Sequence, residues 1–217
     1  MISQYERLAA FIIRLAETPT DADAYNPFGA GGNPYNALRR ANLHRYLSLF
    51  LETPPAVALI GEAPGYRGMR LSGVPFASRR LLLEGVPALG HLGVARGYQD
   101  VPEPTWEKIN AEPSATIFWN ALAELGVLPL VWSAFPFHPH QAGKPHTNRA
   151  PRPAERRLGA PLLKELLTLF QPKQIIAVGN VAHRSLRELG YACPKVRHPS
   201  HGGKHDFVAG LRLHLQP

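Results

Sequence analysis

The sequence predicts an α/β fold: a three-layer α/β/α sandwich around a central, mainly parallel four-stranded sheet. Two observations lead to this prediction. Short, continuous apolar runs alternate along the chain with segments of helical periodicity, which is the pattern of parallel sheets covered by helices. Two of the apolar runs also end in turns rich in glycine and proline. In such folds ligands bind beyond the carboxyl ends of the strands.

The N-terminal part of the chain reads as two helices joined by a loop. Apolar side chains recur at helical spacing over residues 5–17, and a second helix is expected over residues 36–51. Glycine and proline punctuate the loop at 21–35, and Thr53-Pro54-Pro55 ends the second helix.

The first strand is expected at residues 56–60, a continuous apolar run that enters a Gly-Pro turn. A helix is expected to start over residues 79–83, and residues 85–104 are expected to be irregular. A further helix at 116–125 and a strand at 128–135 follow.

The C-terminal part continues the alternation. Residues 138–153 form a loop with four prolines and three histidines, and residues 154–170 carry leucines along one face of a helix. Strands are expected at 174–178 and 195–196, with a helix between them that begins at Asn180 and ends near Gly190.

Composition and charge narrow the class of protein. The 217 residues fit a single domain, 1–217, in which 1–52 hold the N-terminal helices and loop and 56–217 form the core. Twenty-four Lys and Arg outnumber 16 Asp and Glu, for a net charge of +8, which favours a polyanionic partner. No secretion signal or apolar stretch of about 20 residues is recognisable, so we expect a cytoplasmic protein that does not enter a membrane.

The single cysteine, Cys193, excludes a disulfide within the chain and a site held by several thiolates. We expect no cofactor and no metal. Histidines at 138, 140 and 146 invite a metal site, but no neighbouring acid or cysteine completes one. The simpler interpretation is that these histidines face the surface or DNA.

Two loops combine residues that can carry chemistry. Gly61-Glu62-Ala63-Pro64-Gly65 follows the first strand, so Glu62 lies at a strand end, where a carboxylate can act as a base or stabilise positive charge. Arg197-His198-Pro199-Ser200 and the following His201-Gly202-Gly203-Lys204 offer a hydrogen-bond donor to a departing anion and groups that bind phosphate. Each loop alone would be read as an ordinary turn.

Together the two loops resemble the uracil-DNA glycosylase superfamily, and they are most similar to its iron–sulfur branch, family 4. Between them, Ser72-Gly73-Val74-Pro75-Phe76 is similar to a Gly-x-Pro-Phe segment of that branch, and Asn148-Arg149-Ala150-Pro151-Arg152-Pro153 is similar to its Asn-Arg-x-Pro-x-Pro stretch. The resemblance runs from about Ala56 to the C-terminus. It implies a monomeric enzyme that flips uracil, or another deaminated base, out of DNA and hydrolyses its N-glycosidic bond.

The resemblance also implies roles for individual residues. Glu62 matches the acid that orients water or stabilises the cationic sugar, His198 the histidine that supports the uracil anion, and Phe76 the ring that stacks on the base. Ser200 matches the serine that grips phosphate. The residues expected to contact the base are Gly61, Ala63, Pro64, Gly65, Phe76 and Ser133; those expected to contact DNA are Arg197, Pro199, Ser200 and Lys204.

Three departures separate this chain from that branch. The four cluster cysteines are missing. Ser133 stands where an asparagine reads the uracil edge, and a hydroxyl cannot make the paired contact of an amide, so the choice of base is open. Ala63 stands where some branches have a catalytic Asp or Asn, which leaves Glu62 as the acid of the first loop. No lysine lies within Gly61–Gly65 or Arg197–Ser200, so we expect no Schiff-base lyase step.

Two other functions compete with this interpretation. A non-catalytic nucleic-acid-binding member of the same fold would suit Ser133, but it would not explain why both Glu62 and His198 are present. A nucleoside or phosphate hydrolase on a similar sheet would not explain the loop from His198 to Lys204.

Overall fold

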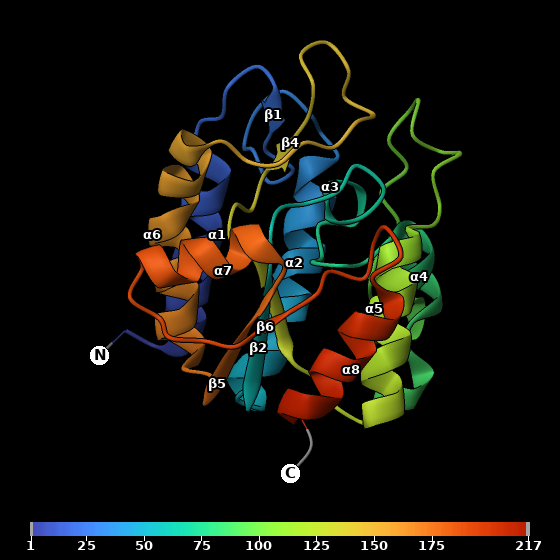
Figure 1. The fold of residues 1–217 in the computed structure, drawn as a ribbon. Helices are drawn as coiled ribbons and strands as arrows, with labels where there is room; N and C mark the ends of the chain where they lie inside the picture. Colours follow the sequence, from blue (N-terminus) through green and yellow to red (C-terminus); the bar gives the residue numbers. More distant parts are fainter. Residues whose placement is uncertain (1, 216–217) are drawn as a thin grey trace.

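A computed structural model describes residues 2–215 and places four parallel strands at the centre of the molecule (Figure 1). All neighbouring strands pair in parallel, in the order β3-β2-β5-β6. Their bounds are β2 (Val57–Gly61), β3 (Leu130–Ser133), β5 (Gln174–Val178) and β6 (Lys195–Val196). The predicted α/β class and its four-stranded parallel sheet are therefore confirmed. The strand predicted at 128–135 is shorter than expected.

Helices cover the sheet in two groups. In Figure 1, α1 (Gln4–Glu17), α6 (Pro153–Phe170) and α7 (Asn180–Glu188) gather on one flank. The other flank holds α4 (Arg79–Glu84), α5 (Pro113–Leu125) and α8 (Lys204–Leu215). The remaining elements are α2 (Asn36–Glu52), the short α3 (Met69–Ser72), the 3₁₀ turns η1 (Pro87–Leu89) and η2 (Val94–Arg96), and a two-stranded antiparallel pair of β1 (Ala24–Tyr25) with β4 (His138–Pro139).

Local sequence explains where these helices begin. The first helix starts with a capping box, in which the Ser3 side chain accepts from the backbone N–H of Glu6 and Glu6 accepts from the backbone N–H of Ser3. Its buried face brings the ring of Phe11 to 5.7 Å from that of Trp132 on β3. Pro113 and Pro153 occupy the first turns of α5 and α6, where a missing N–H costs nothing.

One side chain forms hydrogen bonds with the backbone of β3, the strand at the edge of the sheet. The hydroxyl of Tyr46 on α2 donates to the carbonyl of Val131 over 3.2 Å and accepts from its N–H over 2.7 Å. Burial raises the pKa of Tyr46, which keeps the hydroxyl protonated and able to donate. Two backbone groups that an edge strand would leave unpaired are thus satisfied inside the core.

A buried ion-pair triad ties the irregular segment before α5 to the helices. Glu103 lies between the guanidinium groups of Arg39 and Arg70. Burial alone would raise the pKa of Glu103, but the two arginines hold it below its usual range. Such a carboxylate remains ionised inside the protein because two groups of opposite charge lie beside it.

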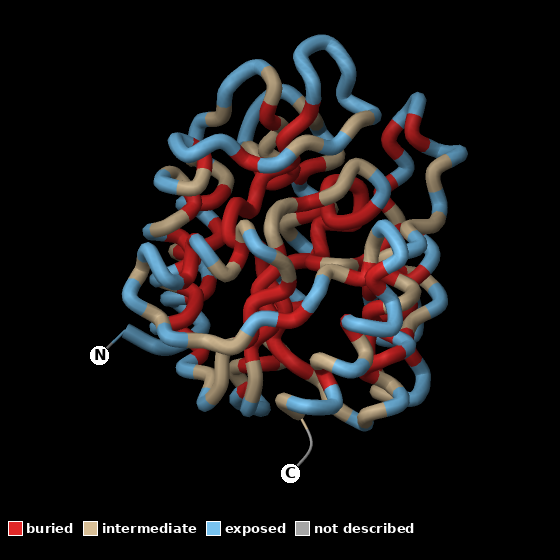
Figure 2. The backbone as a smooth tube through the Cα atoms, viewed as in Figure 1, coloured by how far each residue is buried: buried red, intermediate tan, exposed pale blue. Residues whose placement is uncertain are grey.

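Two features were not foreseen. Residues 204–215, for which no element is predicted from the sequence, form α8 and bury Phe207 and Leu211. The histidines of the 138–146 loop were expected at the surface or facing DNA. That was wrong for His138 and His140, which are both buried. Figure 2 shows that the buried residues gather at the centre of the molecule and that the outer loops are mostly exposed. Within residues 2–215, no helix is long and apolar enough to cross a membrane.

Candidate active site

A cleft of about 630 Å³ lies at the carboxyl ends of the strands and brings the two motifs together. The first loop contributes residues 62–65, and the second contributes Arg197, His198, Ser200 and His201. The start of α7 and the edge strand β6 complete one wall. A second hollow of about 640 Å³, between α2 and residues 90–98, contains none of the residues predicted for the site, so the chemistry is assigned to the first cleft.

Glu62 enters the cleft directly after β2. Its backbone carbonyl accepts from the N–H of Phe135 over 3.0 Å, which continues the sheet pairing one residue past the strand and fixes the chain there. The residue is half-buried, and burial raises the pKa of its carboxyl. A carboxylate that is partly removed from water interacts more strongly with any positive charge that develops beside it.

His198 is held as a neutral ring with a defined tautomer. The backbone N–H of Ser200 donates to its Nδ1 over 3.2 Å, and the Ser200 hydroxyl lies 2.8 Å from the same atom. Burial lowers the pKa of His198 to about 4, and the nearby His201 and Arg197 act in the same direction. Because Nδ1 accepts, the single proton of the neutral ring lies on Nε2, which is left as a hydrogen-bond donor.

The Ser200 hydroxyl contacts the same ring. Since Nδ1 of His198 can only accept, the hydroxyl donates its hydrogen to that ring. In this arrangement Ser200 orients His198. The contact of Ser200 with phosphate stays a prediction.

Phe76 lies beside this cleft and is fixed by close packing. Its ring stacks on Phe118 at 4.2 Å and lies 5.8 Å from the His198 ring. A Cβ atom on Gly61 would come within 2.6 Å of the Phe76 ring, so the glycine makes room for the aromatic side chain. Phe76 also adopts a positive φ of 50°, which is rare for a bulky residue, and the Trp119 indole donates to its carbonyl over 2.9 Å.

Ser133 and Gly61 lie side by side in the sheet, at the carboxyl ends of β3 and β2. Paired residues of neighbouring strands point to the same face, so Ser133 lies on the face of the sheet that Phe76 covers. Ser133 is buried, with 3% of its surface exposed. Neither Ser133 nor Phe76 lines the open cleft, so these two predicted base contacts lie next to it, whereas Ala63, Pro64 and Gly65 line it.

The comparison with known families settles the broad class. Residues 50–209 match the uracil DNA glycosylase superfamily. This chain belongs to the uracil-DNA glycosylase superfamily. Among solved structures, its fold is similar to the crystal structure of wild-type SMUG2 from Pedobacter heparinus, with a TM-score of 0.62 and 15% identity over 96% of this chain and 95% of that one. No curated protein sequence matches the chain.

Two of the residues predicted to bind DNA stay outside the cleft of this superfamily member. Pro199 is a buried residue of the second loop, and Lys204 begins α8 and lines a separate groove between α5 and α8. Arg197 does line the cleft. A lysine that the motifs did not contain, Lys195 on β6, also lines it and donates to the Asn180 side chain over 2.9 Å.

The middle of the chain supports the first loop of this glycosylase fold. The Asn148 side chain accepts from the backbone N–H of Tyr66 over 2.9 Å. The ring of His138 lies between the carbonyls of Pro64 and Pro145, at 2.9 and 3.1 Å. Burial lowers the pKa of His138 to about 4, so the neutral ring donates to one of these carbonyls. This buried histidine therefore braces the loop that carries Glu62.

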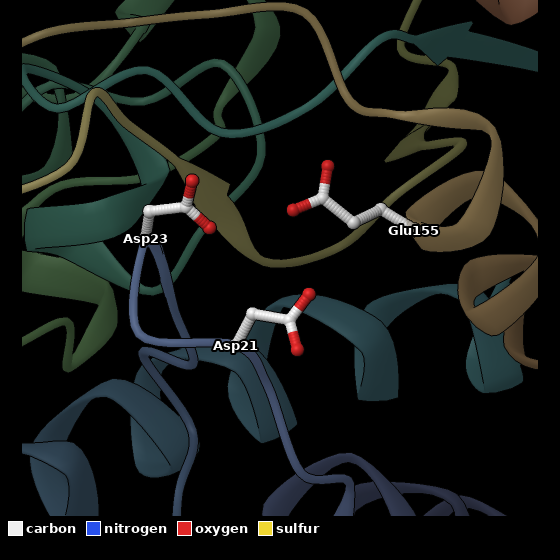
Figure 3. Close-up of side chains that lie close together, drawn as sticks. All are labelled: Asp21, Asp23 and Glu155. Carbon is white, nitrogen blue, oxygen red and sulfur yellow. The ribbon is translucent and has the colours of Figure 1, made fainter.

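Three carboxylates close to one another, Asp21, Asp23 and Glu155, have the spacing of a cation site (Figure 3). Two arginines already pair with two of these carboxylates, Asp23 and Glu155. Arg149 donates to both oxygens of Glu155 over 2.6 and 2.7 Å and pairs with Asp23, which Arg152 also contacts. We therefore assign the cluster to an ion-pair network. It joins the 18–26 loop to the Asn148–Pro153 stretch and so fixes the position of Asn148 beside the cleft.

Sequence reasoning missed one acid of the site, Glu112. It precedes α5 and lines the cleft with Glu62 and His198. Its carboxyl packs against the first loop so closely that a Cβ on Gly65 would lie 2.6 Å from one of its oxygens. No periodicity or motif marks this residue, because its partners lie more than 40 positions away in the chain.

Proposed function

We propose that this protein hydrolyses the N-glycosidic bond of uracil, or of another deaminated base, in DNA and leaves an abasic site. The observation that carries the proposal is the shared cleft of Glu62 and His198, which two distant loops build at one edge of the sheet. Membership of the superfamily supports the reaction class.

The chemistry of the bond explains why these two groups are needed. Cleavage passes through a sugar with oxocarbenium character and a base that departs as an anion. The Glu62 carboxylate stabilises the positive sugar or orients the attacking water. The Nε2–H of His198 donates to the base oxygen on which negative charge develops. Groups already fixed in place stabilise these charges without reorganising during the reaction.

The neutral state of His198 suits this role. A neutral ring gives up no hydration of its own charge on binding, and its donor is aimed by the contact of Ser200 with Nδ1. Phe76 offers an aromatic face close to the same histidine, so a base stacked on that ring would present its edge to the donor. Stacking compensates part of the few kcal/mol that base flipping costs.

Basic side chains line the cleft and could bind the phosphates of DNA. Lys195 and Arg197 line the cleft, and among residues 2–215 neither has a carboxylate within ion-pair distance. The N-terminus of α7 opens onto the same wall, and its free N–H groups also favour negative charge. These groups and the net charge of +8 support DNA as the partner.

The first experiment measures base release from oligonucleotides that hold one uracil, hypoxanthine or xanthine. We expect alkali-dependent strand breaks with the wild type and losses of at least about a hundredfold in Glu62→Gln and His198→Ala. The matched controls Glu17→Gln and His44→Ala change exposed residues outside the cleft and should retain the wild-type rate. DNA binding without release of any base would favour the non-catalytic member of the fold.

The same assay tests two further properties. Because burial raises the pKa of Glu62, activity that needs its carboxylate should fall on the acid side at a higher pH than for an exposed glutamate.

A monofunctional enzyme should also give no covalent adduct with DNA when borohydride is added. A borohydride-trapped adduct that disappears in Lys195→Gln would show a lyase step and overturn the monofunctional assignment.

A further inference from the structure

The cleft contains a second carboxyl that has no place in the chemistry above. Glu112 is the residue before α5, and its side chain does not cap that helix. It is directed to the first loop instead, where its two oxygens lie 2.3 and 2.6 Å from the positions that Cβ atoms on Gly68 and Gly65 would occupy. Two glycines on one turn thus leave space for this carboxyl beside the residues that carry Glu62.

The surroundings of Glu112 favour its neutral form. Burial raises the pKa of its carboxyl to about 7, although Arg67 and the Ser114 hydroxyl act in the opposite direction. The other charged or titratable groups lining the cleft are Glu62, Arg149, Lys195, Arg197, His198 and His201. The Arg149 guanidinium is engaged by Glu155, and the Lys195 ammonium by Asn180. At and below neutral pH a large fraction of Glu112 is therefore protonated.

A protonated carboxyl has a hydrogen-bonding property that the predicted base contacts lack. It offers one O–H donor next to one C=O acceptor, whereas the Ser133 hydroxyl cannot make such a paired contact. Uracil, hypoxanthine and xanthine each present a ring N–H next to a carbonyl oxygen, which is the complementary pair. Cytosine and adenine lack this ring N–H.

We propose that Glu112 is a base-binding residue, whose neutral carboxyl pairs with the N–H and C=O edge of the flipped deaminated base. This inference rests on the proposed glycosylase function and deepens it, because it assigns a residue to the choice of base. Ionised Glu112 loses its donor and places a negative charge opposite a carbonyl oxygen. The paired contact therefore exists only on the acid side of its titration.

The test uses the amide variant as a fixed copy of the neutral carboxyl. Glu112→Gln keeps one donor and one acceptor at every pH, and Glu112→Ala has neither. We expect kcat/KM of the wild type to fall about tenfold or more from pH 6.5 to pH 8.5. That of Glu112→Gln should stay within about twofold of its value at pH 6.5, and Glu112→Ala should be about ten- to a hundredfold slower at pH 6.5. Glu107→Gln, an exposed acid of the same segment, should follow the wild-type profile.

The outcomes separate this inference from the function on which it rests. Loss of base release in the wild type on every substrate overturns the proposed function itself. An active wild type whose alkaline decline is unchanged in Glu112→Gln overturns only the role of Glu112. Thermal unfolding of each variant is measured in parallel. If Glu112→Ala is slow only because it unfolds, the profile of the folded Glu112→Gln variant still decides the question.

Discussion

The packing of Phe76 against Gly61 leads to a quantitative prediction. Replacing Gly61 with alanine puts a methyl group 2.6 Å from one ring carbon of Phe76 and 3.0 Å from the next, where ordinary contacts begin near 3.4 Å. The ring cannot simply retreat, because it stacks on Phe118 at 4.2 Å. Its backbone is also held by the bond from Trp119. The alanine variant must therefore displace or compress a packed aromatic pair.

The expected cost has two components. Overpacking of this kind costs about 1–3 kcal/mol of stability, and a chain of this size loses about 2–4 °C in Tm for each kcal/mol. The proposed catalysis depends on the same ring, since base–aromatic stacking is worth about 1–3 kcal/mol. A displaced Phe76 should thus lower kcat/KM by about 5- to 150-fold.

The assay compares Gly61→Ala with Gly31→Ala in thermal unfolding and in single-turnover base release. Gly31 lies in an exposed loop, and a Cβ there meets no atom within 4 Å, so the same chemical change is harmless. We expect both the lower Tm and the slower release only in Gly61→Ala. A Gly61→Ala variant that matched the wild type in both measurements would show that the packing of Phe76 does not require glycine at this position.

Two further predictions concern stability. Tyr46→Phe removes the hydroxyl that pairs with both backbone groups of Val131 and should lower the free energy of unfolding, measured in urea, by about 2–3 kcal/mol. The control Tyr5→Phe, at an exposed residue, should change this free energy by less than about 0.5 kcal/mol. Equal effects of the two substitutions would refute the role of the edge contact. Glu103→Gln leaves two buried arginines without their carboxylate and should cost about 3–5 kcal/mol at pH 7. Because the folded-state pKa of Glu103 is depressed, its contribution is present above the unfolded pKa of about 4.3 and is lost as the pH falls further, so stability should fall less steeply from pH 5 to pH 3 in the variant than in the wild type.

The sheet and the meeting of the two motifs could be predicted because they depend on local signals. Buried parallel strands are continuous apolar runs, and the predicted bounds of β5 and β6 agree with the structure. Carboxyl ends of parallel strands share one edge, so the loops that follow them meet whatever the details of packing. That rule alone places Glu62 and His198 in one cleft.

The helix α8 was not predicted, although the sequence contains a pattern that indicates a helix. Phe207 and Leu211 are spaced four residues apart, and Gly202 and Gly203 precede the helix. Once the segment before it was interpreted as a phosphate-binding loop, Lys204 was assigned to that loop. The helix instead turns this lysine to the groove beside α5.

Contacts between distant segments could not be predicted from one sequence. The role of Gly61 was expected to be a close approach to the base, but in the structure the space beside it is filled by Phe76 from a segment 15 positions away. Glu112 reaches the first loop from an irregular segment with no periodicity of its own. His138 was assigned to the surface because polar residues in a proline-rich loop usually lie there, whereas two carbonyl oxygens give this one hydrogen-bonding partners in the interior.

The two carboxyls of the cleft have different proposed roles, which require different protonation states. Glu62 must be ionised to stabilise a cationic sugar, and burial raises its pKa, which sets an acid limb to the activity. Glu112 must be protonated to pair with the base, and a pKa of about 7 sets an alkaline limb. His198, with a pKa of about 4, stays neutral between these limits. The expected pH profile of kcat/KM is therefore bell-shaped, and the decline at alkaline pH is due to Glu112 alone. In Glu112→Gln this alkaline decline should disappear, whereas the decline at acid pH should remain.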